Sequence, residues 1–302
     1  MNWIVATLFS AFFLGIYDLC TKHAVRANAV TPVLFLSTLT GATVWGILLA
    51  VHAVLPGALP SSLVTDTLTV QQHLQILLKS GIVAASWVGT YFAMKYLPLS
   101  LGSPIRATSP LFTLFGAIVI LGERPTVLET IGVLTTLASF VGLSVVGRSE
   151  GVNFLRNKWV WLLILGTLFG AISSLYDKYL LGTLKFTVPT VQCWFSIYLL
   201  VFFAPFALGW KLRLWPRNEF SWRWSVPFIA LSLLVADYAY FWALSNPDGL
   251  VSLVMSLRRA STLVAFAGGL LFFHEINGWR KLPAVLGILF GIVLTICGRA
   301  VH

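Results

Sequence analysis

The sequence predicts an all-α integral membrane protein in which ten transmembrane helices form two inverted five-helix repeats. Three observations lead to this fold class: an apolar composition, ten apolar runs of membrane-spanning length, and an internal duplication. Of the 302 residues, 58% are hydrophobic and only 10% are charged, whereas a typical soluble domain has about 25% charged residues. Lipid, not water, is therefore the expected main solvent, and ten crossings of roughly 20 residues would occupy most of the chain.

Each of the ten apolar runs is bounded by Pro, Gly, Trp or a charged residue. Backbone polar groups in lipid must be satisfied within the segment, and the alternating pattern of a membrane barrel is absent, so each run is predicted to be a helix. The connections leave no room for a separate soluble enzyme domain. The predicted helices cover residues 3–21, 31–54, 74–97, 103–121, 127–147, 159–181, 188–209, 225–244, 249–272 and 282–299.

The duplication is clearest between residues 104–123 and 256–275, which align without a gap. Upstream of them, residues 90–98 resemble residues 240–248. The pair Tyr17-Asp18 in the first helix likewise corresponds to Tyr176-Asp177 in the sixth. Equivalent positions of the two aligned stretches carry the same residue at Arg106 and Arg258, Ser109 and Ser261, Leu111 and Leu263, Gly116 and Gly268, and Glu123 and Glu275.

A unit of five helices crosses the membrane an odd number of times, so its second copy must be upside down. We therefore expect residues 1–150 to form the first repeat and residues 151–302 the second. Inverted repeats of this kind are the plan of many secondary transporters, in which equivalent elements exchange conformations around a site near the bilayer midplane. The plan itself predicts alternating access.

The ten helices, the doubled unit and a fourth helix of each repeat that ends in Glu resemble the drug/metabolite transporter superfamily, and within it the EamA-type ten-helix transporters. The residues that carry this resemblance are Leu121-Gly122-Glu123, Phe273-His274-Glu275 and the stretch Leu257-Arg258-Arg259-Ala260-Ser261. The resemblance implies a carrier of amino acids or other metabolites, and it does not transfer a substrate. The pair Tyr17-Asp18 departs from the commoner family pattern.

Three acidic residues, Asp18, Asp177 and Asp237, fall inside predicted helices, and the other seven belong to connections or helix ends. An ionised side chain at the bilayer centre costs about 2.5–3.5 kcal/mol on insertion scales, so each of the three is expected to face the bundle interior and to have a partner. Asp237 has no equivalent in the third helix. It could carry a coupling proton, or it could simply bond to a neighbouring Tyr or Arg.

Topology places one acidic and basic cluster near each membrane face. We expect Asp18–Arg106 and Asp177–Arg258 to form and break alternately as gates, with the surplus positive charge binding an anionic or zwitterionic solute. The planar fork of Arg suits this task because it binds carboxylate or phosphate through two parallel hydrogen bonds. The alternative is that these pairs are static and merely satisfy buried charges. The two clusters are Asp18, Lys22 and Arg106 on one face, and Asp177, Lys178, Arg258 and Arg259 on the other.

Four tyrosines are predicted cavity-wall residues, although aromatic packing would explain them almost as well. They are Tyr17, Tyr91, Tyr176 and Tyr240. Two small-residue spacings, Gly166-x-x-x-Gly170 and Gly287-x-x-x-Gly291, permit close helix contact, which we expect within the chain, with a dimer contact as the alternative.

Most Lys and Arg residues fall in the connections 1–2, 3–4, 5–6, 7–8 and 9–10, and by the positive-inside rule these are cytoplasmic. This bias predicts a multi-pass protein of the cytoplasmic (inner) membrane with both termini non-cytoplasmic, whereas the superfamily resemblance implies the opposite orientation. Lys79 is assigned to the less basic face, with Arg124, Lys185 and Arg299.

The function predicted from these features is secondary transport of a small polar, anionic or zwitterionic metabolite, by an exporter or exchanger. Its expected partners are that small-molecule substrate and the lipid bilayer, in a monomer or homodimer. No cofactor, metal, nucleic acid or ATPase subunit is implied, because the sequence has no phosphate-binding loop and its five His residues are scattered. A flippase for a lipid-linked or amphiphilic solute is the alternative. An integral-membrane enzyme would need a convergent His, Asp and Glu set, so the protein is predicted not to be an enzyme.

Overall fold

The structure is a computed structural model, and all of its regular structure is helical in the part of the chain that it describes. That part comprises residues 2–26, 28–96, 105, 108–145, 157–214, 219–261, 263, 264, 267 and 278–300.

The observed helices lie within the ten predicted apolar runs or extend them by a few residues. The fourth run contains Ile105 and α5, separated by a turn at Thr108, and the ninth contains α10 and the 3₁₀ turn η3. The elements are α1 (Trp3–Val25), α2 (Val30–Val54), η1 (Ser61–Leu63), α3 (Val70–Tyr96), α5 (Ser109–Leu121), α6 (Val127–Val145), α7 (Lys158–Lys178), η2 (Tyr179–Thr183), α8 (Val188–Lys211), α9 (Ser225–Ser245), α10 (Val251–Leu257), η3 (Arg258–Ala260) and α12 (Gly278–Ala300).

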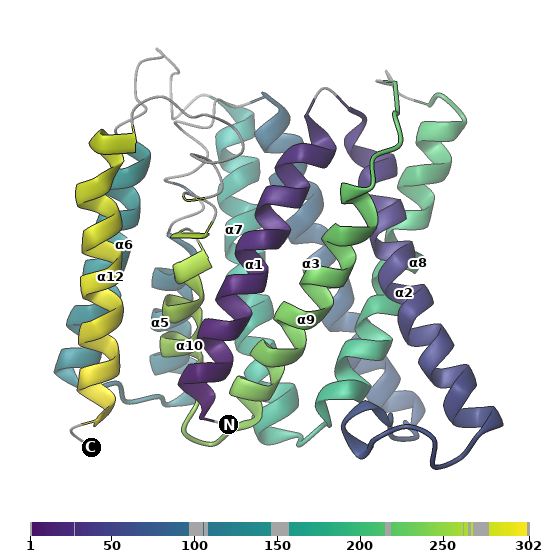
Figure 1. The fold of residues 1–302 in the computed structure, drawn as a ribbon, viewed down its shortest axis with the longest axis horizontal. Coiled ribbons are helices and arrows are strands. Elements are labelled where there is room, and N and C mark those ends of the chain that lie inside the picture. The colour runs from purple at the N-terminus through teal and green to yellow at the C-terminus, as the bar shows by residue number, and fades with distance from the viewer. Residues whose placement is uncertain are drawn as a thin grey trace.

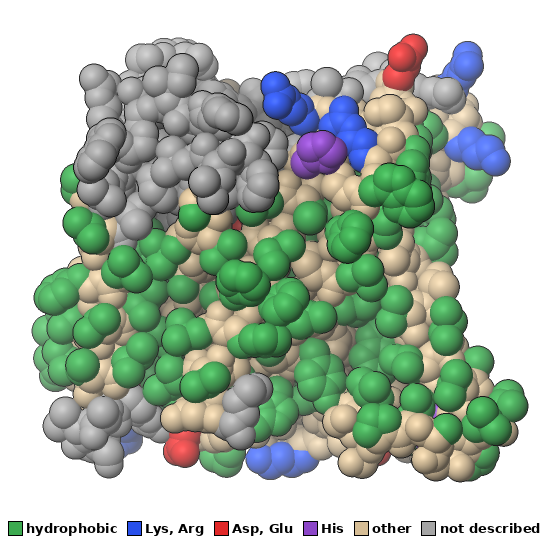
Figure 2. Space-filling view, viewed as in Figure 1, with side chains coloured by type: hydrophobic (Ala, Val, Ile, Leu, Met, Phe, Trp, Pro, Cys, Tyr) green, Lys and Arg blue, Asp and Glu red, His purple; other side chains and the backbone are tan. Residues whose placement is uncertain are grey.

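The helices stand side by side and run from one face of the molecule to the other, and both ends of the chain lie at the same face (Figure 1). Among the described residues, five helices are long and apolar enough to span a membrane: α1, α2, α7 with its continuation η2, α8 and α9. Large apolar side chains such as Phe12, Phe115 and Ile120 are exposed on the outside. They form a broad belt, and charged side chains gather at its two rims (Figure 2). This distribution is that of a multi-pass membrane protein.

Local sequence signals set several helix ends. Asn2 and Asn157 cap α1 and α7 by accepting hydrogen bonds from the backbone N–H two residues later, at 3.1 and 2.9 Å. Thr126 and Glu129 form a capping box at the start of α6, with reciprocal bonds of 2.6 and 3.2 Å. Gly122 ends α5 in the left-handed region, at φ 67°, where a residue without Cβ is favoured.

Small residues bring two pairs of helices into close contact, as the two glycine spacings predict. A Cβ on Gly291 of α12 would meet the backbone nitrogen of Thr136 on α6 at 2.6 Å. A Cβ on Gly166 of α7 would meet the Ser86 carbonyl oxygen on α3 at 3.0 Å. Both pairs join the first half of the chain to the second, so the prediction of packing within the chain is confirmed.

Candidate solute site between the two halves

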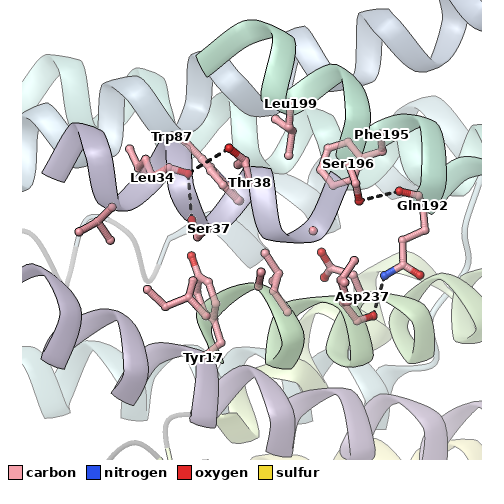
Figure 3. A pocket seen from close by; sticks show the side chains of 16 residues that line it. Tyr17, Leu34, Ser37, Thr38, Trp87, Gln192, Phe195, Ser196, Leu199 and Asp237 are labelled. Carbon is pink, nitrogen blue, oxygen red and sulfur yellow. Dashed lines mark hydrogen bonds between the residues drawn. The ribbon is translucent and has the colours of Figure 1, made fainter. Parts of the chain in front are cut away.

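A small cavity lies between α1, α2, α3, α8 and α9 (Figure 3). Its volume is about 40 Å³, which holds only a few water molecules. Most of its wall is apolar, from residues such as Trp87 and Phe195. The polar lining residues are Tyr17, Ser37, Thr38, Gln192, Ser196 and Asp237.

The charged group on this wall, Asp237, is paired with Arg258. The Arg258 Nη2 donates to Asp237 Oδ1 at 2.8 Å, and the two side chains are 11% and 17% exposed. Arg258 comes from η3 and Asp237 from α9, so the pair joins two separate helical segments. From the sequence alone, Asp237 could either carry a coupling proton or bond to a neighbouring Arg or Tyr. In the structure its partner is Arg258.

Tyr240, one turn along α9 from Asp237, joins this pair to a second one. The Arg258 guanidinium carbon lies 4.1 Å from the centre of the Tyr240 ring, a cation–π geometry. The Tyr240 hydroxyl donates to Asp177 Oδ2 on α7 at 3.3 Å. Tyr240 is only 3% exposed, so its ring and hydroxyl are both held by named partners.

The second pair joins Lys79 of α3 to Asp177 of α7. Lys79 Nζ lies 2.6 Å from Asp177 Oδ1, with side-chain exposures of 2% and 5%. The same ammonium lies 4.0 Å from the ring centre of Phe195 and 5.0 Å from that of Phe241. Lys79 therefore lies deep inside the bundle, whereas the sequence had assigned it to the less basic membrane face.

The two pairs replace the ion pair expected between Asp177 and Arg258. The sequence assigned both residues to one cluster near one membrane face, but topology does not determine how each helix is rotated about its axis. In the structure, Asp177 turns toward α3 and its Lys79, while Arg258 turns toward Asp237 on α9. The Asp177–Arg258 pair is therefore not made in this conformation, and its alternate formation and breaking stays a prediction.

Helix geometry is irregular at or next to several of the predicted site residues. The helix continues past Asp177 and Lys178 as the π-helical turn η2, and Arg258 and Arg259 form the 3₁₀ turn η3 directly after α10. In the fourth run, Thr108 is a turn residue whose hydroxyl donates to the Ile105 carbonyl at 2.6 Å. Such interruptions are frequent at functional sites in helices because they free backbone groups and allow bending.

Lys178 and Glu123 both hold the connection between α9 and α10. The Lys178 ammonium donates to the carbonyl oxygens of Leu244, Asn246 and Gly249 at 3.0, 3.0 and 2.8 Å. The Glu123 carboxylate accepts from the backbone N–H groups of Val251 and Ser252 at 2.6 and 3.2 Å and from the Ser252 hydroxyl at 2.6 Å. Glu123 comes from the end of α5, so it fastens the first half of the chain to the start of α10.

The other predicted site residues lie on elements around this network. Tyr17 lines the cavity, and Asp18 is half-buried next to it in α1. Tyr176 is half-buried, with its ring centre 5.8 Å from that of Tyr179. Arg259 is half-buried in η3. Lys22 and Tyr91 lie in α1 and α3 but their side chains, like the whole of Arg106, are outside the described residues.

Three contributors to the site were missed by sequence reasoning. Lys79 follows the polar start of α3, where Gln71, Gln72 and His73 made the segment look like a membrane boundary. Gln192 and Glu123 carried no signal of burial, although the repetition of Glu123 as Glu275 pointed to a shared role. The structure gives Glu123 the role of an N-terminal cap on α10.

Comparison with known proteins bears on the family and on the fold. A solved crystal structure of a protein superimposes with a TM-score of 0.72 at 16% sequence identity, over 99% of this chain and 98% of that one. At this identity the likeness concerns the fold alone. No curated protein matches the chain. Residues 1–145 match the model of the EamA-like transporter family, which confirms the resemblance to the drug/metabolite transporter superfamily drawn from the sequence.

Proposed function

We propose that this chain is a secondary active transporter, an exporter or exchanger, that moves a small polar, anionic or zwitterionic metabolite by alternating access. The observation that carries the proposal is Asp237, which lies on the wall of a cavity that helices of both halves enclose and pairs with Arg258 behind it. Charges are expensive inside a membrane and persist there mainly for solute or ion handling. The family matched by residues 1–145 is a family of transporters.

An inverted-repeat plan, with residues 1–150 and 151–302 as the two units, is supported by the pattern of helix contacts. If the two units correspond, α1, α2, α3, α5 and α6 match α7, α8, α9, α10 and α12 in that order. This correspondence relates the contact α1–α9 to α7–α3, the contact α2–α9 to α8–α3, and the contact α5–α7 to that of α10 and η3 with α1. The contacts α2–α8, α5–α10 and α6–α12 then map onto themselves. All of these contacts are present, as a two-fold relation would require.

Polar connections at opposite ends of the bundle support the same relation. Asn28 bonds both ways with Ser221, at 2.8 and 2.9 Å, and so joins the α1–α2 connection to the segment before α9. Thr187 donates to Asp66 at 2.6 Å and so joins the start of α8 to the α2–α3 connection. Asn28 and Thr187 each follow the repeated aspartates Asp18 and Asp177 by ten residues. The two sets of hydrogen bonds between connections therefore occupy related positions in an inverted duplication.

Interrupted helices at matched positions support a site at the interface of the two units. Thr108 aligns with Ala260 of η3, so the turn in the fourth run corresponds to the 3₁₀ turn in the ninth. Discontinuous helices around a central site are a recurrent device of transporters built from inverted repeats. We therefore retain Asp18, Lys22, Arg106, Lys178 and Arg259 as candidate gate or solute residues, and Asp237 as a candidate for proton coupling.

The guanidinium of Arg258 supports an anionic or zwitterionic solute, because such a group binds carboxylate or phosphate through two hydrogen bonds. The two described pairs are neutral, and Arg258 offers a guanidinium next to the cavity wall. We further propose that the protein resides in the cytoplasmic membrane with both termini non-cytoplasmic, because the basic connections lie at the other face.

The experiment that tests this function combines ligand screening with transport. Metabolites that raise the unfolding temperature of the detergent-purified protein would be assayed by counterflow in proteoliposomes. We expect Arg106→Ala and Arg258→Ala to reduce flux at least about tenfold, which corresponds to one lost charge-assisted interaction. Glu219→Ala, which changes an exposed residue, is the control. Near-normal flux through both arginine variants, with normal incorporation, would overturn the proposal.

A further inference from the structure

We propose that Arg258 is an anion subsite with an exchangeable partner: a carboxylate or phosphate group of the cargo takes the place that Asp237 occupies in this structure. The inference rests on the proposed transport function and deepens it by naming the group recognised and the residue displaced.

The first observation is that Arg258 uses only half of one edge of its guanidinium. Nη2 donates to Asp237 Oδ1 at 2.8 Å, while the neighbouring Nε is buried and has no hydrogen-bond partner among the described residues. Nε and Nη2 together form an edge that matches two oxygens of a carboxylate or phosphate. A buried donor without a partner is costly. A ligand that occupied both nitrogens would therefore be a better partner than Asp237 in its present position.

The second observation is that the guanidinium is held by groups that do not compete for this edge. Tyr240 lies under its plane at 4.1 Å and is fixed by its hydrogen bond to Asp177. The Asp177 carboxylate is in turn neutralised by Lys79 at 2.6 Å. The nearby negative charge of Asp177 is thus already matched, and Asp237 is the described carboxylate that must leave for an anion to bind.

The third observation is that Asp237 connects Arg258 to the cavity. Asp237 lines the cavity and is 17% exposed, whereas Arg258 is not part of the lining. Rotation of Asp237 away from Arg258 would open a route from the cavity to the guanidinium and leave the carboxylate on a wall that water can reach. In Figure 3, Asp237 lies on the same side of the cavity as Tyr17, across from Ser37 and Thr38.

A second buried atom without a hydrogen-bond partner among the described residues belongs to a residue of the cavity wall, and it narrows the chemistry of the cargo. Gln192 donates through Nε2 to the Leu234 carbonyl at 2.6 Å, but its Oε1 is buried without a hydrogen-bond partner among the described residues. Gln192 and Asp237 both line the cavity. A cargo that carries a hydrogen-bond donor, such as a hydroxyl, near its anionic group would satisfy both Gln192 and Arg258.

The test measures equilibrium binding of two simple probes, acetate and inorganic phosphate, to the purified full-length protein in neutral detergent at constant ionic strength. We expect Asp237→Asn, which removes the competing charge and keeps the side-chain shape, to bind the probes roughly tenfold more tightly than the wild type. Arg258→Gln should lose the binding. Glu219→Gln makes the corresponding carboxylate-to-amide change at an exposed site and should bind like the wild type.

A lipid headgroup could supply the same phosphate chemistry, so a second arm uses phosphatidylcholine nanodiscs with and without phosphatidylglycerol. If Asp237→Asn binds the free probes or the anionic lipid more tightly than the wild type does, the displacement of Asp237 by an anion is supported. Whichever of the two binds more tightly identifies the source of that anion. Equal affinity of Asp237→Asn and wild type for both, or binding that survives Arg258→Gln, overturns it. Counterflow measured in parallel separates the two proposals. Solute flux without displacement of Asp237 by an anion contradicts only this inference. Displacement of Asp237 without solute flux contradicts only the transport function.

Discussion

Lys79 and Asp177, which come from different halves of the chain, form an ion pair of 2.6 Å that is almost sealed from solvent. The pair sits at the end of a polar chain that continues through Tyr240 and Arg258 to Asp237 at the cavity wall. The Lys79–Asp177 link joins the two halves of the chain, and the other links lie within the second half. The network is therefore placed where solute binding and the packing of the two halves can influence each other.

Breaking the Lys79–Asp177 pair from one side should be strongly destabilising. Lys79→Met or Asp177→Asn leaves an uncompensated buried charge, which typically costs about 3–5 kcal/mol. The double variant Lys79→Met with Asp177→Asn should recover most of that loss, because no charge then remains unpaired. Denaturant unfolding in mixed micelles measures this cycle, with Lys158→Met at an exposed position as the control. Additive losses in the double variant would show that the pair has no such coupling.

The α6–α12 contact should not tolerate a methyl group at Gly132. A Cβ there would meet the backbone nitrogen of Thr295 at 2.6 Å and the Gly291 carbonyl oxygen at 2.7 Å. Gly132→Ala should lower the free energy of unfolding by about 1–3 kcal/mol, as overpacking does. Gly142→Ala, in the same helix but with no atom within 4 Å of its added Cβ, should leave stability unchanged or raise it. Equal behaviour of the two variants would contradict the close packing.

Glu123 should be required to hold the start of α10. Glu123→Ala leaves the N–H groups of Val251 and Ser252 without their carboxylate, which should cost about 1–3 kcal/mol. Because α10 leads directly into Arg258, flux should fall with stability. Unfolding in micelles and counterflow would be measured together, with the exposed Glu219→Ala as the comparison. A Glu123→Ala protein that is as stable as that comparison would argue against the cap.

Membrane orientation should follow the basic connections. Alkaline phosphatase fused after His302 should be active, and a green fluorescent protein at the same place should be dark, if both termini are non-cytoplasmic. The reverse pair of results would show that the superfamily's usual orientation applies and that the charge bias misleads here.

Much of the fold could be predicted because hydropathy and length are properties of single segments. The predicted run at residues 225–244 is α9 almost to the residue, and the glycine spacings at Gly166 and Gly287 fall at helix contacts within the chain. Both signals depend on local sequence and on general rules of membrane packing. The residues 1–145 also match the family that the repeated motifs had indicated.

The partners of the buried charges could not be predicted in the same way. Arg258 and Asp177 were identified as costly intramembrane charges, but ion pairing depends on helix rotation and on contacts between segments distant in sequence. Lys79 lies 98 residues before Asp177 in the numbering, and its polar surroundings at the start of α3 concealed its burial. Glu123 was read as a helix-end residue, which is correct, while its bonds to α10 depend on tertiary structure.

The central claim is that one cavity between the two halves opens in turn to both faces of the membrane. Ser37 lines that cavity and bonds only within its own helix turn, to the Leu34 carbonyl at 2.9 Å, among the described contacts, so Ser37→Cys in a background lacking the three native cysteines is a mild probe. Sealed vesicles of either orientation would be treated with a small membrane-impermeant methanethiosulfonate reagent. The account predicts that the introduced thiol reacts in both orientations, and reaction from one face alone, or from neither, would contradict it.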